Sequence, residues 1–335
     1  MTGSNSHSGD TYVATDVTGH GLDTISLAWR GDAAHDLVAA LGDSFHGEGK
    51  ARTGPGGAYL ETIEPGITVG AYPDHGMAFI EGRLAPILTG ESTDRTLYPA
   101  DILADNQDAI WERAAGFYGL DNGTPDSVGV RRADLSVDVG FSGGCGLGLL
   151  DGIASLDPPR YKLTVYRSGS RTETVNLITA KRGVIVMRVY DKGMEQGTGR
   201  PGETIRMERP MRFGKAKQMA PEELAGIDLA KAHRGGLAPF AAQAESVEVV
   251  SPGAAGATLL DLWRAGKLSR AEARRLAGHV LFAHNSVPLT KTEQRVDQRD
   301  RADLRAVGLA VTDWDVMEGK TLALGDVLRS VAEVW

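Results

Sequence analysis

The chain has 335 residues, 36 Lys and Arg against 44 Asp and Glu, a formal net charge of −8 and one cysteine. This length allows two domains with a proper hydrophobic core, and Cys145 alone excludes an internal disulfide and a paired-cysteine zinc site. No stretch approaches the roughly 20 apolar residues of a membrane helix, so we expect no membrane partner and a cytoplasmic location.

The charge is unevenly distributed along the chain. Residues 1–150 carry 8 basic and 21 acidic residues, whereas residues 151–335 carry 28 basic and 23 acidic ones. Within residues 160–217 the count is 14 basic against 5 acidic. An acidic mean argues against a polyanionic partner, but this window could bind one, or could equally be a solvated basic face.

The first half of the chain predicts an α+β arrangement. Residues 1–20, rich in Ser, Thr and Gly, are expected to form a disordered tail. Alternating apolar residues predict a first strand at 23–30, and helical spacing follows at 33–41. Further short strands are expected at 59–63, 67–72 and 77–82, and a helix at 100–118.

Five more strands are expected in the middle of the chain, at 128–139, 161–167, 172–178, 183–191 and 204–209. Short turns between them suit antiparallel pairing. The sequence therefore predicts an α+β fold with a mainly antiparallel sheet and flanking helices, as one domain over residues 21–225.

The last part of the chain is predicted to be different. Residues 226–256, rich in Ala, Gly and Pro, indicate a linker. Residues 257–335 are expected to be a helical region, with capping boxes at Ser269–Glu272 and Thr290–Glu293 starting helices at 270–284 and 291–306. This region is a candidate for DNA binding or oligomerisation.

Several common site patterns are absent from the sequence. Glycines 143–148 do not close a dinucleotide-binding register, and the segment before Gly319-Lys320-Thr321 lacks the earlier glycine of a P-loop. No closely spaced histidine pair lies on a predicted strand. Any bound metal would therefore use carboxylates, which favours Mg²⁺ or Mn²⁺.

Three predicted strands each have one apolar face and one face of ionisable groups, because residues two apart in a strand point the same way. A solvated sheet face also alternates in this manner. The polar residues, however, are ones that can hold a phosphate and a metal ion. They are Arg188, Tyr190 and Lys192; Arg132, Asp134, Ser136 and Asp138; and Arg206 and Glu208.

These residue types suggest nucleophilic attack on phosphorus. A tyrosine hydroxyl, with an ordinary pKa of about 10, is a weak nucleophile unless cations or a base stabilise the phenolate. Arg188 and Lys192 could stabilise Tyr190, and Arg206 could stabilise charge at the phosphate. The candidate metal ligands are Asp134, Asp138 and Glu208. We expect Tyr190 to lie beside these carboxylates in an open groove.

The segment Met187-Arg-Val-Tyr-Asp-Lys-Gly193 with Glu195, the strand Ile205-Arg-Met-Glu208 and the upstream Arg132-x-Asp134-x-x-x-Asp138 resemble the replication initiation factor family. This family contains rolling-circle initiators of plasmids and phages, and related relaxases. The resemblance spans roughly residues 22–212 and implies a relaxase-like fold in which Tyr190 nicks and rejoins DNA through a 5′-phosphotyrosine.

The resemblance also implies partners and further contacts. The partner would be a DNA origin, with a single-stranded or cruciform nick site, and a host helicase and a homodimer are further expectations. The candidate DNA-binding residues are Arg132, Lys181, Arg182, Arg212, Lys215 and Lys217. A transfer relaxase with the same chemistry, a non-catalytic DNA-binding regulator and a phosphodiesterase or small-molecule enzyme stay open as alternatives.

Overall fold

The structure is a computed structural model. It describes residues 11–12, 15–46, 51–92, 94, 96–120, 123, 125, 127–168, 171–196, 200–214, 218–282, 291–312, 317 and 320–334. The chain divides into two compact units. Unit 1 comprises Met1–Thr18, Val137–Glu208 and Ala230–Trp335, and unit 2 comprises Gly19–Ser136 and Arg209–Leu229.

Ten strands form one hydrogen-bonded sheet in the order β3-β4-β5-β6-β2-β7-β11-β10-β9-β8. The register is antiparallel between β8, β9, β10 and β11, and between β3, β4, β5, β6 and β2. Strands β2 (Thr15–Arg30), β7 (Ser127–Phe141) and β11 (Thr204–Arg212) contribute residues to both units. The fold is α+β with a mainly antiparallel sheet, as the sequence predicts.

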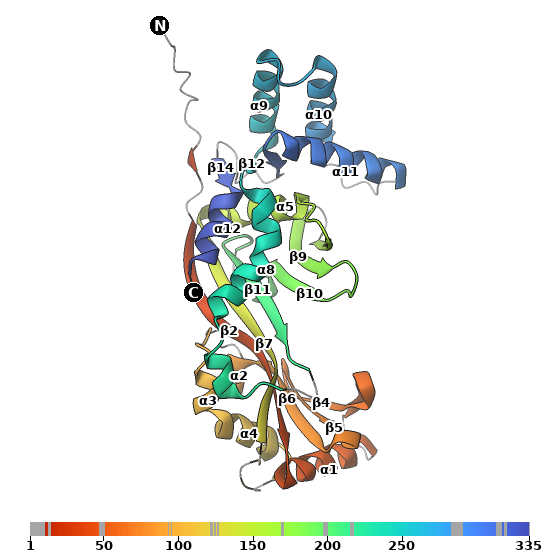
Figure 1. Ribbon diagram of the computed structural model, residues 1–335, viewed down its shortest axis with the longest axis vertical. Helices are drawn as coiled ribbons and strands as arrows, with labels where there is room; N and C mark the ends of the chain where they lie inside the picture. The colour runs from red at the N-terminus through yellow and green to blue at the C-terminus, as the bar shows by residue number, and fades with distance from the viewer. Residues whose placement is uncertain are drawn as a thin grey trace. The chain divides into compact units, whose positions relative to one another are not determined.

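Unit 2 contains a meander covered by a helix. Its strands are β3 (Arg52–Thr53), β4 (Tyr59–Glu64), β5 (Ile67–Tyr72) and β6 (Met77–Arg83). Helix α1 (Asp32–His46) contacts β4, β5 and β6 and buries Ala34, Leu37 and Leu41, the apolar stripe of its sequence (Figure 1). The remaining helices are α2 (Leu84–Thr89), α3 (Ile102–Asp105), α4 (Gln107–Gly116) and α7 (Pro221–Ala225).

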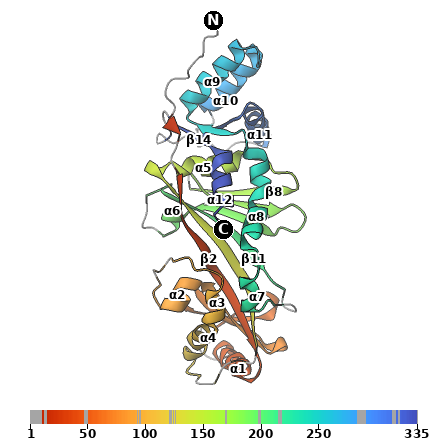
Figure 2. The same ribbon diagram turned by 60° about the vertical axis from the view of Figure 1, so that its left-hand side comes forward.

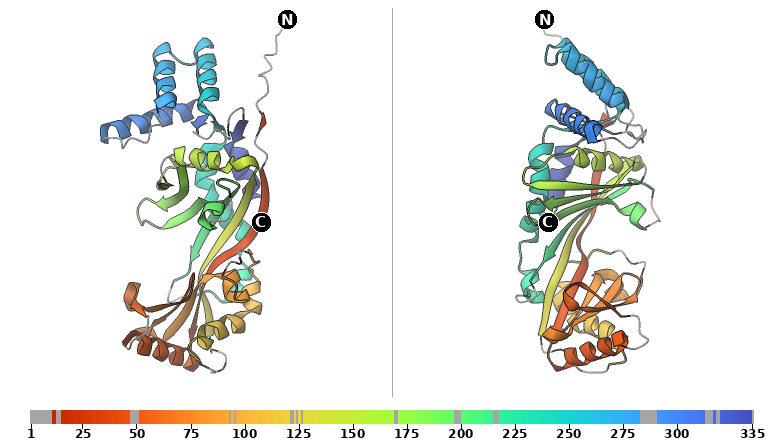
Figure 3. Two further views of the ribbon diagram at one scale, coloured as in Figure 1. Left: turned by 180° about the vertical axis from the view of Figure 1, so that it is seen from behind. Right: turned by 90° about the vertical axis from the view of Figure 1, so that its right-hand side faces the viewer.

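Unit 1 contains the other end of the ten-stranded sheet and a second, smaller sheet. Its outer strands are β8 (Tyr161–Ser168), β9 (Arg171–Thr179) and β10 (Ile185–Asp191), followed by the short helix α6 (Lys192–Gln196). Helix α5 (Gly146–Ser155) contacts β9 and β10 and also the second sheet. Its sequence is almost uniformly apolar, so it can be covered on both sides, and most of its residues are buried. Figure 3 shows the helix between the two sheets.

The second sheet has the order β1-β14-β12-β13 and consists of β1 (Thr11–Tyr12), β14 (Lys320–Ala323), β12 (Glu248–Val250) and β13 (Leu309–Val311). Helices α8 (Leu229–Ala244) and α12 (Leu324–Ala332) lie side by side in Figures 1 and 2. Helices α9 (Pro252–Arg264) and α10 (Arg270–Phe282) form a hairpin that contacts α11 (Lys291–Ala306).

Local sequence signals explain several helix ends. Ser251 caps α9 by accepting a hydrogen bond from the Ala254 amide, and Pro252 occupies the first turn, where no amide hydrogen is needed. The predicted capping box at Ser269–Glu272 is confirmed, since each side chain accepts from the other residue's amide. The box at Thr290–Glu293 includes a residue outside the described ranges.

Three sequence predictions about domain organisation were wrong. The 226–256 segment is no linker, because it forms α8, β12 and the start of α9, and α8 buries Leu237 and Phe240. The 257–335 region is not purely helical, since β13 and β14 join the second sheet. Residues 15–20 of the predicted tail belong to β2, and Thr11–Tyr12 pair with β14. Residues 1–10 lie outside the described ranges.

Apolar periodicity could not reveal that α8 packs in a core, because its Ala and Gly content hides the buried positions.

Among the described helices, none is long and apolar enough to cross a membrane.

Candidate functional site

The predicted sharing of faces between β10 and β11 is confirmed by their register. Arg188 pairs with Glu208, and Tyr190 pairs with Arg206. Side chains of directly paired residues lie on one face of a sheet, so these four polar side chains are neighbours. The intervening residues Met187, Val189, Ile205 and Met207 are fully buried in the core of unit 1 on the opposite face.

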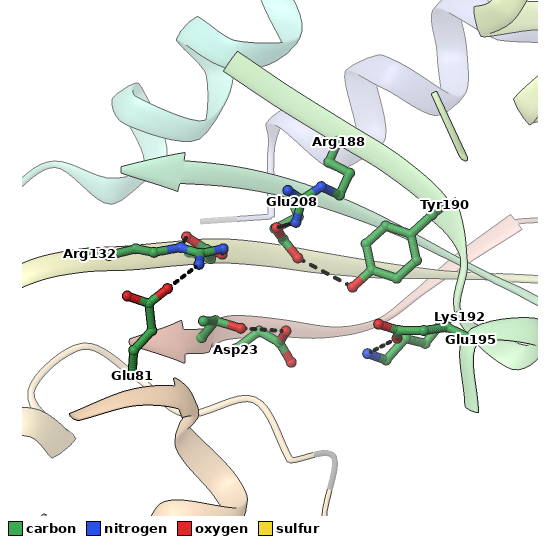
Figure 4. Close-up of polar contacts among 10 residues, drawn as sticks. Asp23, Glu81, Arg132, Arg188, Tyr190, Lys192, Glu195 and Glu208 are labelled. Carbon is green, nitrogen blue, oxygen red and sulfur yellow. Dashed lines mark hydrogen bonds and ion pairs between the residues drawn. The ribbon is translucent and has the colours of Figure 1, made fainter. Parts of the chain in front are cut away.

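The central contact of this site joins a phenol to a carboxylate. The Tyr190 hydroxyl donates to Oε2 of Glu208 at 3.3 Å, and Nη1 of Arg188 donates to Oε1 of the same carboxylate at 2.6 Å (Figure 4). Glu208 is buried, whereas Arg188 is part-exposed. One carboxylate therefore holds the tyrosine hydroxyl and a solvent-reaching guanidinium at the same time.

Lys192 provides a second cation beside the tyrosine. Its Nζ lies 5.5 Å from the centroid of the Tyr190 ring and donates to Oε2 of Glu195 at 2.7 Å. The lysine side chain is nearly fully buried, and Glu195 is part-exposed. A cation at this distance from an aromatic ring interacts favourably with the ring.

Asp191 fixes the chain at the junction between β10 and α6. Its carboxylate accepts from the amides of Met194 at 3.2 Å and Gly202 at 2.8 Å. Burial raises the pKa of Asp191, and these backbone hydrogen bonds oppose the rise. Gly202 has a φ of +73° and approaches the Gly144 carbonyl so closely that a β-carbon would clash with it. These contacts fix the backbone from which the side chain of Lys192, the next residue, extends.

Arg206 is bound by a carboxylate of the neighbouring strand β7. Its Nε and Nη2 donate to the two oxygens of Asp138, each at 2.6 Å, in a bidentate pair. The Arg206 side chain is 1% exposed. Such a pair is a strong structural tie, so Arg206 is oriented by Asp138 in this arrangement.

A separate charged cluster lies in unit 2. Arg132 makes a bidentate contact with Asp134 and donates to Oε1 of Glu81 at 2.8 Å (Figure 4). Burial lowers the pKa of Arg132, but the hydrogen bonds and charges of Asp134 and Glu81 outweigh it and raise this pKa above its usual value. Asp134 is fully buried.

The three predicted metal ligands do not fit a metal ion as arranged here. Asp134 is paired with Arg132, Asp138 with Arg206 and Glu208 with Arg188. Among the residues that the structure describes, no group of three His, Cys, Asp or Glu side chains could hold a metal ion. A cation would have to displace a guanidinium from each ligand, so Mg²⁺ or Mn²⁺ binding stays a prediction.

The expectation of an open groove around the tyrosine was wrong. Tyr190 is 6% exposed, and Lys192, Arg206 and Glu208 are buried as well. The physical reason is that these polar side chains form ion pairs and hydrogen bonds with one another. Such contacts offset the cost of removing charged groups from water, so the side chains can be buried. Arg188 is the member of this group that reaches solvent, with 28% of its side chain exposed.

The remaining predicted DNA-binding residues that the structure describes belong to different units. Lys181 and Arg182 are exposed in the turn between β9 and β10 of unit 1, and Arg212 is exposed at the end of β11 in unit 2. Arg132 is held by its two carboxylates. Lys215 and Lys217 lie outside the described residues, so their role in DNA binding stays a prediction.

Sequence reasoning gave no role to three residues that the structure brings into these clusters: Glu81, Asn176 and Asp191. Glu81 becomes a partner of Arg132 only through the fold. Asn176 pairs with Arg188 across β9 and β10. Only the turn after β10 offered a signal, since an aspartate that precedes a short helix often accepts from its backbone amides.

No family profile matches the chain, and no curated protein matches it. Among solved structures, one that is similar to this chain is a rolling-circle replication initiator. This is the rolling circle replication initiator protein from Geobacillus stearothermophilus, which is 16% identical, with a TM-score of 0.36 over 66% of this chain and 85% of the other.

Proposed function

We propose that this chain is a replication initiator that nicks and rejoins one DNA strand through a covalent bond between Tyr190 and a 5′-phosphate. The observation that carries the proposal is the hydrogen bond from the Tyr190 hydroxyl to Glu208, with Arg188 and Lys192 beside it. The three sequence motifs around these residues, in the order of the family that they resemble, are the second support.

Glu208 is suited to act as the general base. A phenol becomes a competent nucleophile when a nearby group takes its proton, and the Glu208 oxygen already accepts that hydrogen bond at 3.3 Å. The phenolate oxygen would attack phosphorus and form the new O–P bond, while the bond to the 3′-oxygen breaks. The 3′-oxygen leaves as a hydroxyl with the phenol's proton, which Glu208 passes on directly or through water, and its later attack on the phosphotyrosine reverses the reaction.

The cations have different roles in this scheme. Lys192, 5.5 Å from the ring centroid, stabilises the developing phenolate. Arg188 is partly exposed and would meet the phosphodiester, whose non-bridging oxygens gain negative charge during attack. Arg188 would then exchange its contact with Glu208 for one with DNA, which frees the carboxylate to take the proton.

The burial of Tyr190 sets a condition on the reaction. With 6% of its surface exposed, the phenol cannot meet a phosphodiester unless neighbouring side chains move. The pair between Arg188 and Glu208 is the expected point of opening, because it includes the part-exposed cation. A divalent ion remains a separate proposal, and no step above depends on it.

The experiment that tests the proposal is capture of the covalent adduct. Purified protein is mixed with supercoiled DNA that carries the neighbouring replicon sequence, with and without Mg²⁺ or Mn²⁺, and the products are denatured before electrophoresis. We expect nicked DNA with protein on its 5′ end, absent from Tyr190→Phe and retained in Tyr161→Phe. Tyr161 is a suitable control because it lies on β8 and packs against the core.

Two alternatives predict other outcomes. A non-catalytic regulator would bind the DNA and give no adduct with the wild-type chain. A transfer relaxase would give the same adduct at a transfer origin and none at a replication origin, so the two DNA substrates separate these functions.

A further inference from the structure

The polar face of the sheet extends beyond Tyr190 toward the edge strand β8. In the register, Tyr166 pairs with Thr174, and Thr174 pairs with Tyr190. In the next row, Thr164 pairs with Asn176, and Asn176 pairs with Arg188. Directly paired side chains share a face. We call the set formed by Thr164, Tyr166, Thr174, Asn176, Arg188 and Tyr190 the β8–β10 polar face.

Asn176 is an unexplained group in the middle of this face. The residue is 7% exposed, and its side-chain oxygen Oδ1 is buried without a hydrogen-bond partner among the described residues. Buried amide oxygens in folded proteins nearly always have a partner, so this oxygen is an acceptor that a bound molecule could use. The ligand must offer an N–H or O–H donor.

Tyr166 supplies the second independent observation. It is 53% exposed, and it lies on the terminal strand of the sheet. Neighbouring strands are about 4.8 Å apart, which puts Tyr166 roughly 10 Å from Tyr190 along one row of the face. Lys162, exposed four residues earlier on the same strand, adds a positive charge.

We propose that the β8–β10 polar face binds the single-stranded DNA next to the scissile phosphate, with one base stacked on Tyr166 and an adenine held by the amide of Asn176. Exposed aromatic rings stack bases of any sequence in single-strand-binding proteins. An asparagine amide matches adenine, because Oδ1 accepts from N6 and Nδ2 donates to N7. The buried Oδ1 becomes reachable when the paired Arg188 exchanges Glu208 for the DNA. The inference rests on the proposed function for its placement of the scissile phosphate.

The experiment measures binding separately from nicking. Fluorescence anisotropy of labelled oligo(dA) and oligo(dT) is followed with the full chain at one fixed salt concentration. Tyr166→Ala is expected to weaken binding of both strands roughly 10-fold, the effect of one lost stacking contact, while Tyr166→Phe restores it. Phe117→Ala is the matched control, because Phe117 is also an exposed ring, 50% exposed, but belongs to unit 2.

Asn176→Leu, which keeps the size and removes the polar atoms, should reduce the preference for oligo(dA) over oligo(dT) to near unity.

Equal binding by wild type, Tyr166→Ala and Phe117→Ala overturns the inference, and so does an adenine preference that survives Asn176→Leu. If the adduct forms while Tyr166→Ala binds normally, the inference fails and the nicking function stands. If no adduct forms while Tyr166→Ala weakens binding, the nicking function fails alone.

Discussion

At the scale of single residues, one carboxylate contacts both a phenol and a guanidinium. Glu208 accepts from Tyr190 at 3.3 Å and from Arg188 at 2.6 Å. A side chain held in this way can orient the nucleophile and receive its proton. A substitution of similar size can remove these two effects while the protein stays folded.

Replacing Glu208 with glutamine should keep the size of the side chain and remove the base. We expect the nicking rate near neutral pH to fall roughly 100-fold, the usual contribution of a positioned base. Because deprotonation of the phenol would then depend on the solvent, the residual rate of Glu208→Gln should rise with pH more steeply than that of the wild type. Single-turnover nicking at several pH values measures both effects.

The matched control for this substitution is Glu203→Gln, since Glu203 is 43% exposed and pairs only loosely with Arg200 at 4.0 Å. An unchanged nicking rate in Glu208→Gln, with thermal unfolding like that of the wild type, would remove Glu208 from the chemistry.

Asp138 lets the structural and metal-binding interpretations be compared. If its main contact is Arg206, whose side chain is 1% exposed, Asp138→Asn leaves a buried cation without its partner. We expect the free energy of unfolding to fall by about 3 kcal/mol, equally with and without Mg²⁺, in urea titrations. The exposed pair of Asp326 and Arg329 is the control, and Asp326→Asn should change stability by less than about 1 kcal/mol. Destabilisation that appears only with Mg²⁺ present would instead support a metal ligand.

The pKa of Asp191 gives a prediction for the junction between β10 and α6. Since burial raises this pKa above its unfolded value, the carboxyl contributes stability at low pH that is lost as pH rises through the folded pKa. Asp191→Asn does not titrate. The unfolding free energy of the wild type, measured relative to Asp191→Asn, should therefore decrease from acidic to neutral pH. A difference that is constant with pH, or that increases, would contradict the burial of this carboxyl.

At the scale of secondary-structure elements, the sequence predicts strands better than it predicts packing. The periodicity of two identifies β7, β8, β9, β10 and β11 to within a few residues, because each strand has one buried apolar face. It also places Arg188 and Tyr190 on one face. It cannot give the pairing of Arg188 with Glu208 or of Asn176 with Thr164, since register between strands depends on turns and packing that are not local.

The same limit explains the misplaced linker. Helix α8 is rich in Ala and Gly and contains Pro239, which are all features of a connector, yet Phe240 is fully buried in the core of unit 1. The open groove was mispredicted for a related reason. Composition shows that a strand carries ionisable residues, but only the fold shows that their charges pair and become buried.

A substitution in α8 tests the corrected assignment. Phe240→Ala should lower the free energy of unfolding by about 3–5 kcal/mol, because it removes a large ring from a packed core. Arg234→Ala, at an exposed position of the same helix, should change it by less than about 0.5 kcal/mol. Chemical denaturation of both variants measures the difference, and a value near zero for Phe240→Ala would restore the linker interpretation.

At the scale of the whole molecule, the end of the chain belongs to the unit that carries Tyr190. Helix α12 buries Leu324, Val327, Leu328 and Val331 in the same core as Val189 and Met207. We therefore expect truncation after Ala323 to lower the unfolding temperature and to abolish adduct formation. Thermal denaturation followed by circular dichroism, with adduct capture in parallel, measures this; a truncated chain that unfolds and nicks like the full one would show that α12 is dispensable.

The most direct test of the central claim is to identify the residue that carries DNA. Adducts formed on origin DNA are digested with nuclease and trypsin, and the peptides are analysed by mass spectrometry. We predict a nucleotide attached through a 5′-phosphate to the peptide that contains Tyr190, and no nucleotide-bearing peptide from Tyr190→Phe. A nucleotide attached to another tyrosine, or the same adduct formed by Tyr190→Phe, would contradict the account.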